Sequence, residues 1–468
     1  MVFSSLVFIS VFLPAVLLFY WLLPTNAGKN ILLLAASLFF YAYGEPVYVF
    51  LMILSSFFNY LCALWIENRR NNGKTILAFA ILANLFLLCV FKYAGFLTEL
   101  VNGVTDIGLP VPKIALPIGI SFFTFQAMSY VIDVYRRETL PQRNFMYILL
   151  YISLFPQLIA GPIVKYHDVE KELVSRSLDI KETALGIRRF IVGLGKKVLI
   201  ANYMGEVADT LFHAPLSQIQ SAGAWMGAAA FMLQIYFDFG GYSDMAIGLG
   251  RMFGFHFKEN FRYPYAAASI QDFWRRWHIS LSGWFLEYLY IPLGGSRKGR
   301  VRTCLNKFIV FACTGIWHGA NLTFLFWGLF HGCLLMMEEF IPFFQKEKRG
   351  WKNALGHIYV TLAVMIGFVF FRADTIGQGV AWIGKMFTGF QTNPAAARLA
   401  RSQLTPVHIS AFAAGVFASL PVMERIGKDE RARKAFDLAS FAASLALLFV
   451  CMLNLAGGTY NPFIYFRF

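Results

Sequence analysis

The histidine best placed to carry chemistry is His318, in the motif Ile316-Trp317-His318-Gly319-Ala320-Asn321 within a long apolar stretch. Ionisable side chains at membrane depth cost free energy and usually mark functional sites. An imidazole titrates near neutral pH, so a partly desolvated histidine can act as a general base. Trp317, Asn321 and His331 flank it, and we expect Trp317 and Asn321 to support it. The alternative is a structural histidine that satisfies a hydrogen bond between helices.

A second motif, Phe273-Trp274-Arg275-Arg276-Trp277-His278-Ile279-Ser280, lies upstream. Read as one helix from Phe273 to Tyr288, it has an aromatic face and a polar face, which is typical of a helix at the interface or along a cavity. His278 falls at the edge of the aromatic face, and a structural histidine bonded to a carbonyl is the alternative. Arg275 and Arg276 could pair with lipid headgroups or bind an anionic cofactor.

Two carboxylates, Asp238 and Asp244, flank Gly240-Gly241 in apolar sequence. Each needs a partner there, because an isolated buried charge is costly. Arg275, Arg276 or a histidine could supply it. We list both aspartates as supporting residues, with structural ion pairing as the alternative.

The composition is that of a polytopic membrane protein embedded in the lipid bilayer, and we expect its fold to be all-α. Apolar residues make up 58% of the 468 residues and charged residues 14%, whereas soluble domains are typically about 45–50% apolar and about 25% charged. The net charge of +15 comes from short basic clusters between apolar segments, which indicates membrane orientation and argues against nucleic-acid binding. Six scattered cysteines show no ligand spacing, so we expect no metal site.

The apolar segments predict about eleven to thirteen crossings, given the roughly 20 residues that a helix needs to span. They lie at 5–23, 31–43, 47–66, 75–95, 116–134, 145–163, 186–204, 222–239, 305–337 (one helix or two), 355–371, 408–423 and 437–455. Interruptions at Pro117–Gly119, Gly161–Pro162 and Gly240–Gly241 predict broken or re-entrant helices around a cavity. With no soluble domain evident, we expect one integral-membrane domain over 1–468, with its motifs in a core of about 116–337.

Basic residues in short loops predict the orientation. Loops carrying Arg69, Arg70 and Lys74, and Arg136, Arg137 and Arg143, are expected in the cytoplasm, with the N-terminus outside. The clusters Arg297–Lys307 and Lys346–Lys352 are expected on the cytoplasmic side too.

Long strings of the sequence resemble the membrane-bound O-acyltransferases, nearest to the bacterial alginate O-acetylation branch, over essentially the whole chain. The strings are Tyr236–Gly248 (YFDFGGYSDMAIG), Asn260–Tyr265 (NFRYPY), Asp272–Ser282 (DFWRRWHISLS), Trp317–Asn321 (WHGAN) and the ending Asn461–Phe468 (NPFIYFRF). The resemblance implies a bundle of about eleven transmembrane helices pierced by a central tunnel. It makes His318 the catalytic histidine and His278 a second, upstream one. The polar stretch at 424–437 is shorter than the insertion of some alginate members.

We therefore expect an O-acetyltransferase in a bacterial cytoplasmic (inner) membrane. The donor would be acetyl-CoA, used from the cytoplasm and not tightly bound. The acceptor would be an exported alginate-, cellulose- or peptidoglycan-like polysaccharide, reached directly or through a periplasmic or extracellular acetyltransferase partner. His318 would take the proton of the attacking hydroxyl, while His278, Asn321 or Asp244 orients it or stabilises the oxyanion. Arg275 and Arg276, with Arg297 and Lys298, are candidates for the CoA phosphates.

Other readings stay open. An acyl-histidine intermediate is one variant, and a cysteine nucleophile at Cys313 or Cys304 is another. D-alanyl transfer to teichoic acid from a carrier-protein thioester is a close enzymatic alternative. A transporter or flippase would also show many broken helices and buried polar residues.

Overall fold

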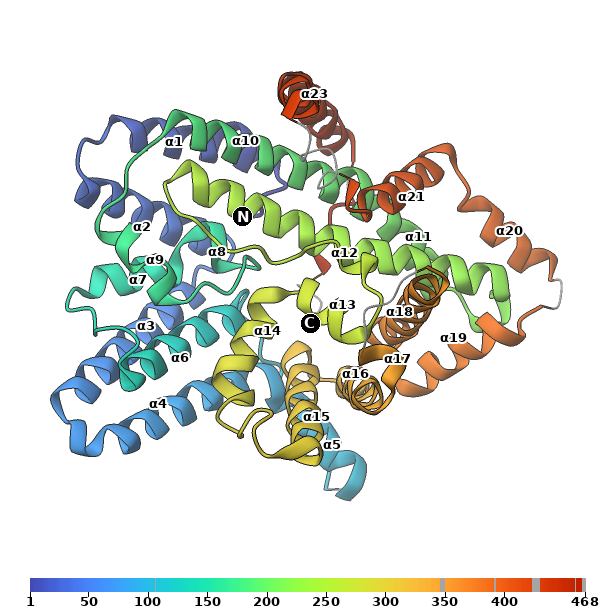
Figure 1. Cartoon of the computed structure of the whole chain (residues 1–468), viewed down its shortest axis with the longest axis horizontal. Coiled ribbons are helices and arrows are strands. Elements are labelled where there is room, and N and C mark those ends of the chain that lie inside the picture. The colour runs from blue at the N-terminus through green and yellow to red at the C-terminus, as the bar shows by residue number, and fades with distance from the viewer. Residues whose placement is uncertain (106, 346–349, 391–392, 423–429, 459, 465–468) are drawn as a thin grey trace. The chain divides into compact units, whose positions relative to one another are not determined.

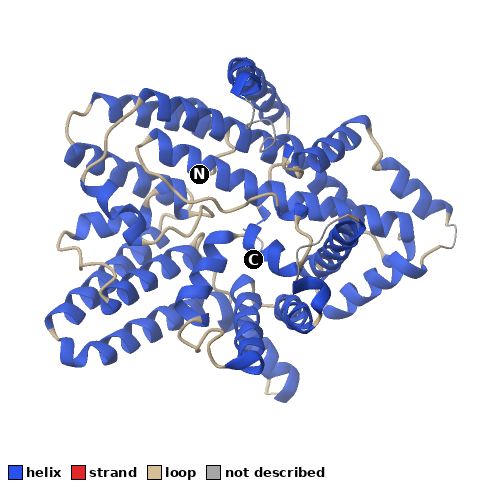
Figure 2. Ribbon diagram, in the orientation of Figure 1, coloured by secondary structure: helices blue, strands red, loops and turns tan. Residues whose placement is uncertain are grey.

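The computed structural model describes residues 1–105, 107–345, 350–390, 393–422, 430–458 and 460–464. These residues form helices joined by loops and turns, with no β-strand among them (Figures 1 and 2). The chain divides into two compact units, Met1–Phe190 with Ser243–Glu259, and Ile191–Tyr242 with Asn260–Phe468. Compactness does not decide whether the units fold separately, so the single domain over 1–468 stays a prediction.

The first unit is built mainly from the N-terminal helices. They are α1 (Leu13–Leu22), α2 (Asn26–Ala42), α3 (Tyr48–Asn68), α4 (Gly73–Leu88), α5 (Ala94–Thr105), α6 (Ile120–Arg136), α7 (Phe145–Ser153), α8 (Phe155–Leu158), α9 (Tyr166–Val174) and most of α10 (Ile180–Gly195). Buried Arg176 donates to the Tyr20 hydroxyl at 2.7 Å and to the carbonyl of Phe253 at 3.1 Å. These bonds tie α1 to the end of α12 (Ser221–Met252), whose last residues belong to this unit.

The second unit contains both histidine motifs. A π-helical turn, η4 (Lys196–Ala201), leads into α11 (Asn202–His213), and most of α12 follows. The remaining helices are α13 (Ile270–Arg276), α14 (Ile279–Phe285), α15 (Gly299–His318), α16 (Leu322–Phe340), α17 (Pro342–Gln345), α18 (Trp351–Arg372), α19 (Ile376–Thr388), α20 (Pro394–Ser402), α21 (Pro406–Ala418) and α23 (Glu430–Gly457). Its core is a continuous cluster of apolar side chains from α11, α12, α13, α16 and α18.

Four helical stretches among the described residues are long and apolar enough to cross a membrane. They are Tyr48–Asn68, Arg70–Thr105, Trp351–Arg372 and Ala439–Gly457. Phe8–Leu22 and Pro406–Ala418 are shorter apolar helices. The all-helical architecture is confirmed, while the count of about eleven crossings and the central tunnel stay predictions.

Two of the three predicted helix interruptions are present. Helix α6 begins only after Gly119, whose φ of 77° favours glycine, and Gly161-Pro162 lies outside the helices. The third prediction was wrong, because α12 runs unbroken through Gly240-Gly241. An added Cβ at Gly241 would lie 2.7 Å from the carbonyl oxygen of Gly193, so this glycine serves close helix packing. The span expected over 145–163 is two short helices, α7 and α8.

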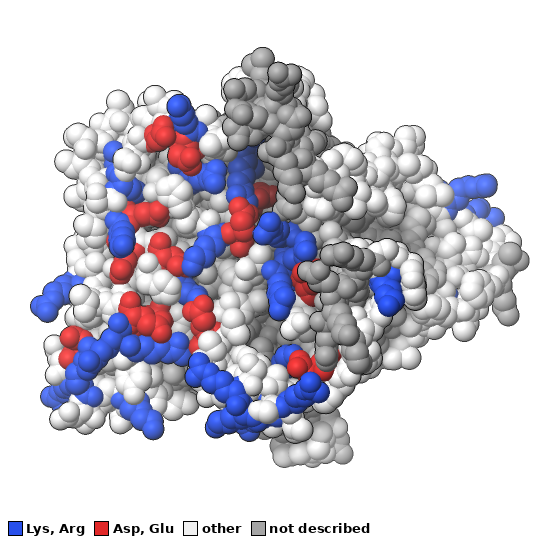
Figure 3. All heavy atoms as spheres, viewed as in Figure 1, with Lys and Arg blue, Asp and Glu red and all other residues white. Residues whose placement is uncertain are grey.

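Charged side chains gather on one face over the elements of the first unit, where Lys and Arg alternate with Asp and Glu (Figure 3). Several form ion pairs across that unit, such as Lys258–Asp168 at 2.6 Å and Arg189–Asp244 at 2.9 Å. The predicted clusters at Lys346–Lys352 and 424–437 fall partly outside the described residues.

Candidate active site

His318 is positioned by two helices packed at backbone contact. The apolar stretch 305–337 forms two helices, and α15 ends at His318. An added Cβ at Gly328 of α16 would lie 2.3 Å from the carbonyl oxygen of Phe311, and one at Gly315 would lie 2.4 Å from that of Phe324. Glycines let the helix backbones approach this closely. This close packing determines the position of the end of α15, and with it the position of His318.

The imidazole of His318 is 5% exposed and lies among aromatic rings. Its ring centroid is 5.0 Å from that of Trp317, 5.0 Å from that of Trp327 and 5.3 Å from that of Phe371. All three contacts are edge-to-face. This environment excludes bulk water, so a base here would act in a dry site.

His278 lies at a break between two short helices. The predicted single helix from Phe273 to Tyr288 was wrong, because α13 ends at Arg276 and α14 begins at Ile279. His278 adopts a left-handed conformation with φ 44° and ψ 54°, which is uncommon for residues other than glycine. Such outliers persist only where the surroundings impose them, and they cluster at functional sites.

The side chains of Ser269 and Glu338 cap the start of α13. The Ser269 hydroxyl accepts from the backbone N–H of Asp272 at 3.1 Å. The carboxylate of Glu338, on α16, accepts from the N–H groups of Ile270 at 2.6 Å and Gln271 at 3.0 Å. A carboxylate at a helix N-terminus satisfies free donors and complements the helix dipole.

Asn260 determines which nitrogen of His278 carries the proton. Its Oδ1 accepts from the backbone N–H of Ser280 at 3.1 Å and lies 3.2 Å from Nδ1 of His278. Because a backbone N–H can only donate, the contacted Asn260 atom is the oxygen, and Nδ1–H must donate to it. In the neutral ring Nε2 then keeps its lone pair. Nε2 forms no hydrogen bond with any described residue, so it is an available acceptor.

The two histidines line one small apolar cavity. Its volume is about 10 Å³. A cavity of this size has room for about one water molecule. The lining residues are Ile235, Phe239, Trp277, His278, His318, Trp327, Phe368, Phe371 and Ile464. The structure thus brings together the two histidines that the sequence singled out.

The two flanking candidates, Asn321 and Trp317, differ in their contacts with the cavity residues. Asn321 caps α16, since its Oδ1 accepts from the backbone N–H of Thr323 at 3.0 Å and its amide donates to the carbonyl of Asp374 at 2.9 Å. It is not among the residues lining the cavity. Trp317 is buried and contacts both histidines, with its ring centroid 6.2 Å from that of His278 and 5.0 Å from that of His318.

The ion pairs of the two aspartates involve cations other than those that the sequence suggested. Asp244 belongs to the first unit, where its partner is Arg189 at 2.9 Å. Asp238 pairs with Lys197 at 2.7 Å, and both side chains are buried. The sequence offered Arg275, Arg276 or a histidine as partners, whereas helix packing supplies Arg189 and Lys197.

Arg275 and Arg276 do not line the cavity. Arg276 pairs with Asp272 one turn earlier at 2.9 Å, and Arg275 is exposed. Cys304 is buried and Cys313 is partly buried, and neither lines the cavity.

His331 and Asn260 are features that the sequence did not separate from the scaffold. His331 is fully buried, with its ring centroid 5.2 Å from Trp327 and 5.3 Å from Trp274. An added Cβ at Gly367 would lie 2.8 Å from its Nε2, so glycine there makes room for the ring. Asn260 opened the NFRYPY string, but nothing local indicated its contact with His278.

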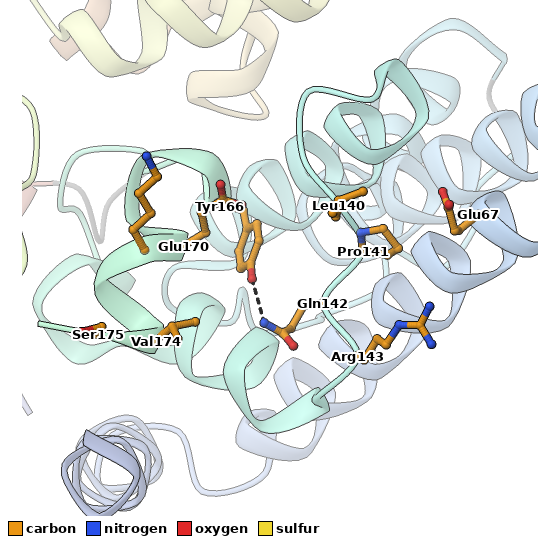
Figure 4. A pocket seen from close by; sticks show the side chains of 10 residues that line it. Glu67, Leu140, Pro141, Gln142, Arg143, Tyr166, Glu170, Val174 and Ser175 are labelled. Carbon is orange, nitrogen blue, oxygen red and sulfur yellow. Dashed lines mark hydrogen bonds between the residues drawn. The ribbon is translucent and has the colours of Figure 1, made fainter. Parts of the chain in front are cut away.

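The first unit holds two further polar features. A larger cavity of about 720 Å³ is lined by Glu67, Arg143, Glu170 and Lys171 among others, and there Gln142 donates to the Tyr166 hydroxyl at 3.1 Å (Figure 4). Asp133, Glu138 and His167 have possible metal-ligand atoms within 4.8 Å of one another. His167 already contacts Asp133 through Nδ1 at 3.0 Å. Neither feature contains a candidate site residue.

The sequence of this chain is similar to a known protein family and to several named proteins over a region that includes both histidines. Residues 123–373, which include both histidines, match the model of the membrane-bound O-acyltransferase family. The chain is 37% identical over 494 residues to a probable alginate O-acetylase of Pseudomonas putida, covering 100% of both chains. It is 37% identical over 412 residues to a peptidoglycan O-acetyltransferase of Helicobacter pylori, covering 80% of this chain and 78% of that protein. Identity to a teichoic acid D-alanyltransferase of Bacillus subtilis is 28% over 271 residues, 54% of this chain and 66% of that protein. These matches confirm the resemblance seen in the motifs.

Proposed function

Because the chain belongs to the membrane-bound O-acyltransferase family, we propose that this multi-pass membrane enzyme moves acetyl groups from cytoplasmic acetyl-CoA to an exported polysaccharide. The observation that carries the proposal is the single cavity lined by His278 and His318. Similarity to proteins named alginate O-acetylase and peptidoglycan O-acetyltransferase supports acetyl as the acyl group and an envelope polymer as the acceptor.

In the proposed reaction a hydroxyl oxygen of the acceptor attacks the thioester carbonyl. His318 takes the hydroxyl proton, the new ester bond forms, and the C–S bond breaks. The leaving thiolate then receives that proton from His318. A dry cavity suits this chemistry, because water that entered would hydrolyse the thioester.

His278 has a different role in this proposal. With Nδ1–H directed at Asn260, its Nε2 is an acceptor and cannot donate to an oxyanion. We therefore assign it to positioning, where it accepts a polar hydrogen of the bound acceptor. The proposal gives no oxyanion role to Asn321, whose amide donates to the carbonyl of Asp374, or to Asp244, whose carboxylate pairs with Arg189.

The orientation remains part of the proposal. Arg69, Arg70, Lys74 and Arg143 are exposed, which fits loops in the cytoplasm. Arg275 is the better candidate for a CoA phosphate, since Arg276 is paired with Asp272. A periplasmic or extracellular acetyltransferase would receive the acetyl group on a serine if the sugar is not itself the acceptor.

The test is polymer acetylation in cells that carry His318→Ala. Loss of a general base typically lowers the rate by about 10²–10⁴-fold, so acetylation should fall to background. His256→Ala is the control, because that histidine is 59% exposed by side chain and belongs to the first unit. Unchanged acetylation with His318→Ala at normal protein levels would overturn the proposal.

The identity of the acyl donor distinguishes acetyl transfer from D-alanyl transfer. Purified protein should transfer label from acetyl-CoA and not from a D-alanyl carrier protein. The reverse result would favour D-alanyl transfer, which the lower similarity to the teichoic acid enzyme leaves as the second candidate. A transporter would show substrate flux but no acetyl transfer by the purified protein.

A further inference from the structure

The segment Tyr460–Ile464, which follows α23, is held in the second unit by a row of polar contacts. Four of them join it to α11, η4 and α12: the Tyr460 hydroxyl to Asp209 at 2.7 Å, Asn202 to Asn461 at 3.3 Å, Lys197 to the Pro462 carbonyl, and the Ile464 N–H to Asp238 at 2.6 Å. An added Cβ at Gly205 would lie 2.8 Å from the Tyr460 hydroxyl. A glycine there makes room for this segment.

The strongest anchor is the ion pair of Lys197 and Asp238. Their charged atoms are 2.7 Å apart, and the side chains are 4% and 2% exposed. Buried charges are stable only when their remaining hydrogen-bonding capacity is also used. Here Asp238 accepts from the N–H of Ile464 through its second oxygen, and Lys197 donates to the carbonyl of Pro462. The ion pair therefore forms hydrogen bonds to two residues of the segment, Pro462 and Ile464.

Ile464, whose N–H is bonded to Asp238, also lines the cavity that contains His278 and His318. Asp238 lies on α12 between Ile235 and Phe239, which line the same cavity. Ile464 is the lining residue that comes from the segment after α23, whereas the other eight lie in or directly beside α12, α13, α14, α15, α16 and α18. The cavity has room for about one water, so a bound acyl group must press against its walls.

We propose that Asp238 and Lys197 are positioning residues that hold Ile464 as the wall limiting the size of the acyl group. This inference rests on the proposed acyl transfer and adds a size-determining residue to it. Shortening Ile464 creates space for longer acyl chains, and one methylene in an apolar pocket is worth about 10- to 200-fold in discrimination.

The first experiment measures donor selectivity of the purified full-length protein. Acetyl-CoA and butyryl-CoA are compared with the native chain and with Ile464→Ala. The ratio of butyryl to acetyl transfer should rise by about tenfold or more. Phe463→Leu is the matched control, because Phe463 packs on Tyr242 at 4.8 Å between centroids and does not line the cavity. An unchanged ratio in Ile464→Ala, or an equal rise in the control, overturns the size role.

The second experiment needs no acyl transfer. Ile464→Cys is introduced, and its reaction with a maleimide is measured against the unsubstituted chain, which corrects for the exposed Cys89 and Cys333. The buried thiol should react slowly and should react severalfold faster once Asp238→Ala is added. Glu339→Gln, which breaks the Lys307–Glu339 pair elsewhere in the unit, should leave the rate unchanged.

A double variant keeps this test decisive if Asp238→Ala does not fold. Lys197→Met with Asp238→Leu removes both charges and keeps the packed volume, a change that buried pairs tolerate. It should also speed labelling of the Ile464→Cys thiol, and an unchanged rate overturns the anchoring role. If the native protein transfers no acetyl group, the proposed function fails while labelling still tests the anchor. If acetyl transfer occurs and labelling is unchanged, only this inference fails.

Discussion

Nδ1 of His278 lies 3.2 Å from Oδ1 of Asn260, and this contact decides which nitrogen of the ring can accept a proton. The same oxygen accepts from the backbone N–H and the hydroxyl of Ser280, at 3.1 and 2.8 Å. Asn260 thereby stabilises the left-handed backbone at His278 and fixes the ring proton on Nδ1. Nε2 of His278 is therefore a hydrogen-bond acceptor at the cavity before any substrate binds.

Replacing Asn260 by Ala should therefore lower acyl transfer. In metal sites, removal of the partner that orients a ligating histidine costs about 10- to 100-fold, and we expect a loss of the same order here. Asn260→Asp keeps an acceptor oxygen and should retain more activity than Asn260→Ala. Polymer acetylation at matched protein level is the measurement. Asn353→Ala is the control, since it removes another Asn–His contact, to His357 at 3.0 Å. Equal losses in Asn353→Ala and Asn260→Ala would contradict the assignment.

His278→Asn and His278→Val should separate stability from activity. Asparagine tolerates a left-handed conformation, whereas a β-branched residue there is strained by about 1–2 kcal/mol. We expect thermal unfolding in detergent to show His278→Asn as the more stable variant, with both inactive in acetylation. A more stable valine variant would mean that the backbone relaxes at this position.

Gly328→Ala should destabilise the helix pair that holds His318. The new Cβ would lie 2.3 Å from the Phe311 carbonyl oxygen, and overpacking of this kind costs about 1–3 kcal/mol. The melting temperature in detergent should fall, together with acetylation. Gly384→Ala on α19 is the control, because nothing lies within 4 Å of the added atom. Equal melting temperatures for both variants would refute the packing argument.

Glu338→Ala should weaken the start of α13 and so displace His278. It deletes the acceptor of two backbone N–H groups, and hydrogen bonds to charged groups contribute about 1.5–3 kcal/mol each. The neighbouring Glu339→Ala removes the partly exposed pair with Lys307, and a pair of this kind is worth about 0–1 kcal/mol. Unfolding temperature and acetylation should therefore fall much further for Glu338→Ala. A larger effect at Glu339 would contradict this ranking.

Several features were predictable because they depend on local sequence. Hydropathy and composition indicated the all-helical membrane class, and the motif strings indicated the family and the two histidines. Helix continuity was less predictable: Gly240-Gly241 looked like a break, yet α12 passes through it. A glycine pair has the same sequence whether it bends a helix or lets a neighbouring helix approach.

The sequence by itself established which side chains could do chemistry, since residue type and apolar surroundings are written along the chain. Folding in three dimensions assigned their partners. Asp238 meets Lys197 on one side and Ile464 on the other, the latter 226 positions away in sequence. Asn260 reaches His278 only because the chain turns between α13 and α14. Such pairings depend on helix packing, which brings distant residues within hydrogen-bond distance and leaves no local signal.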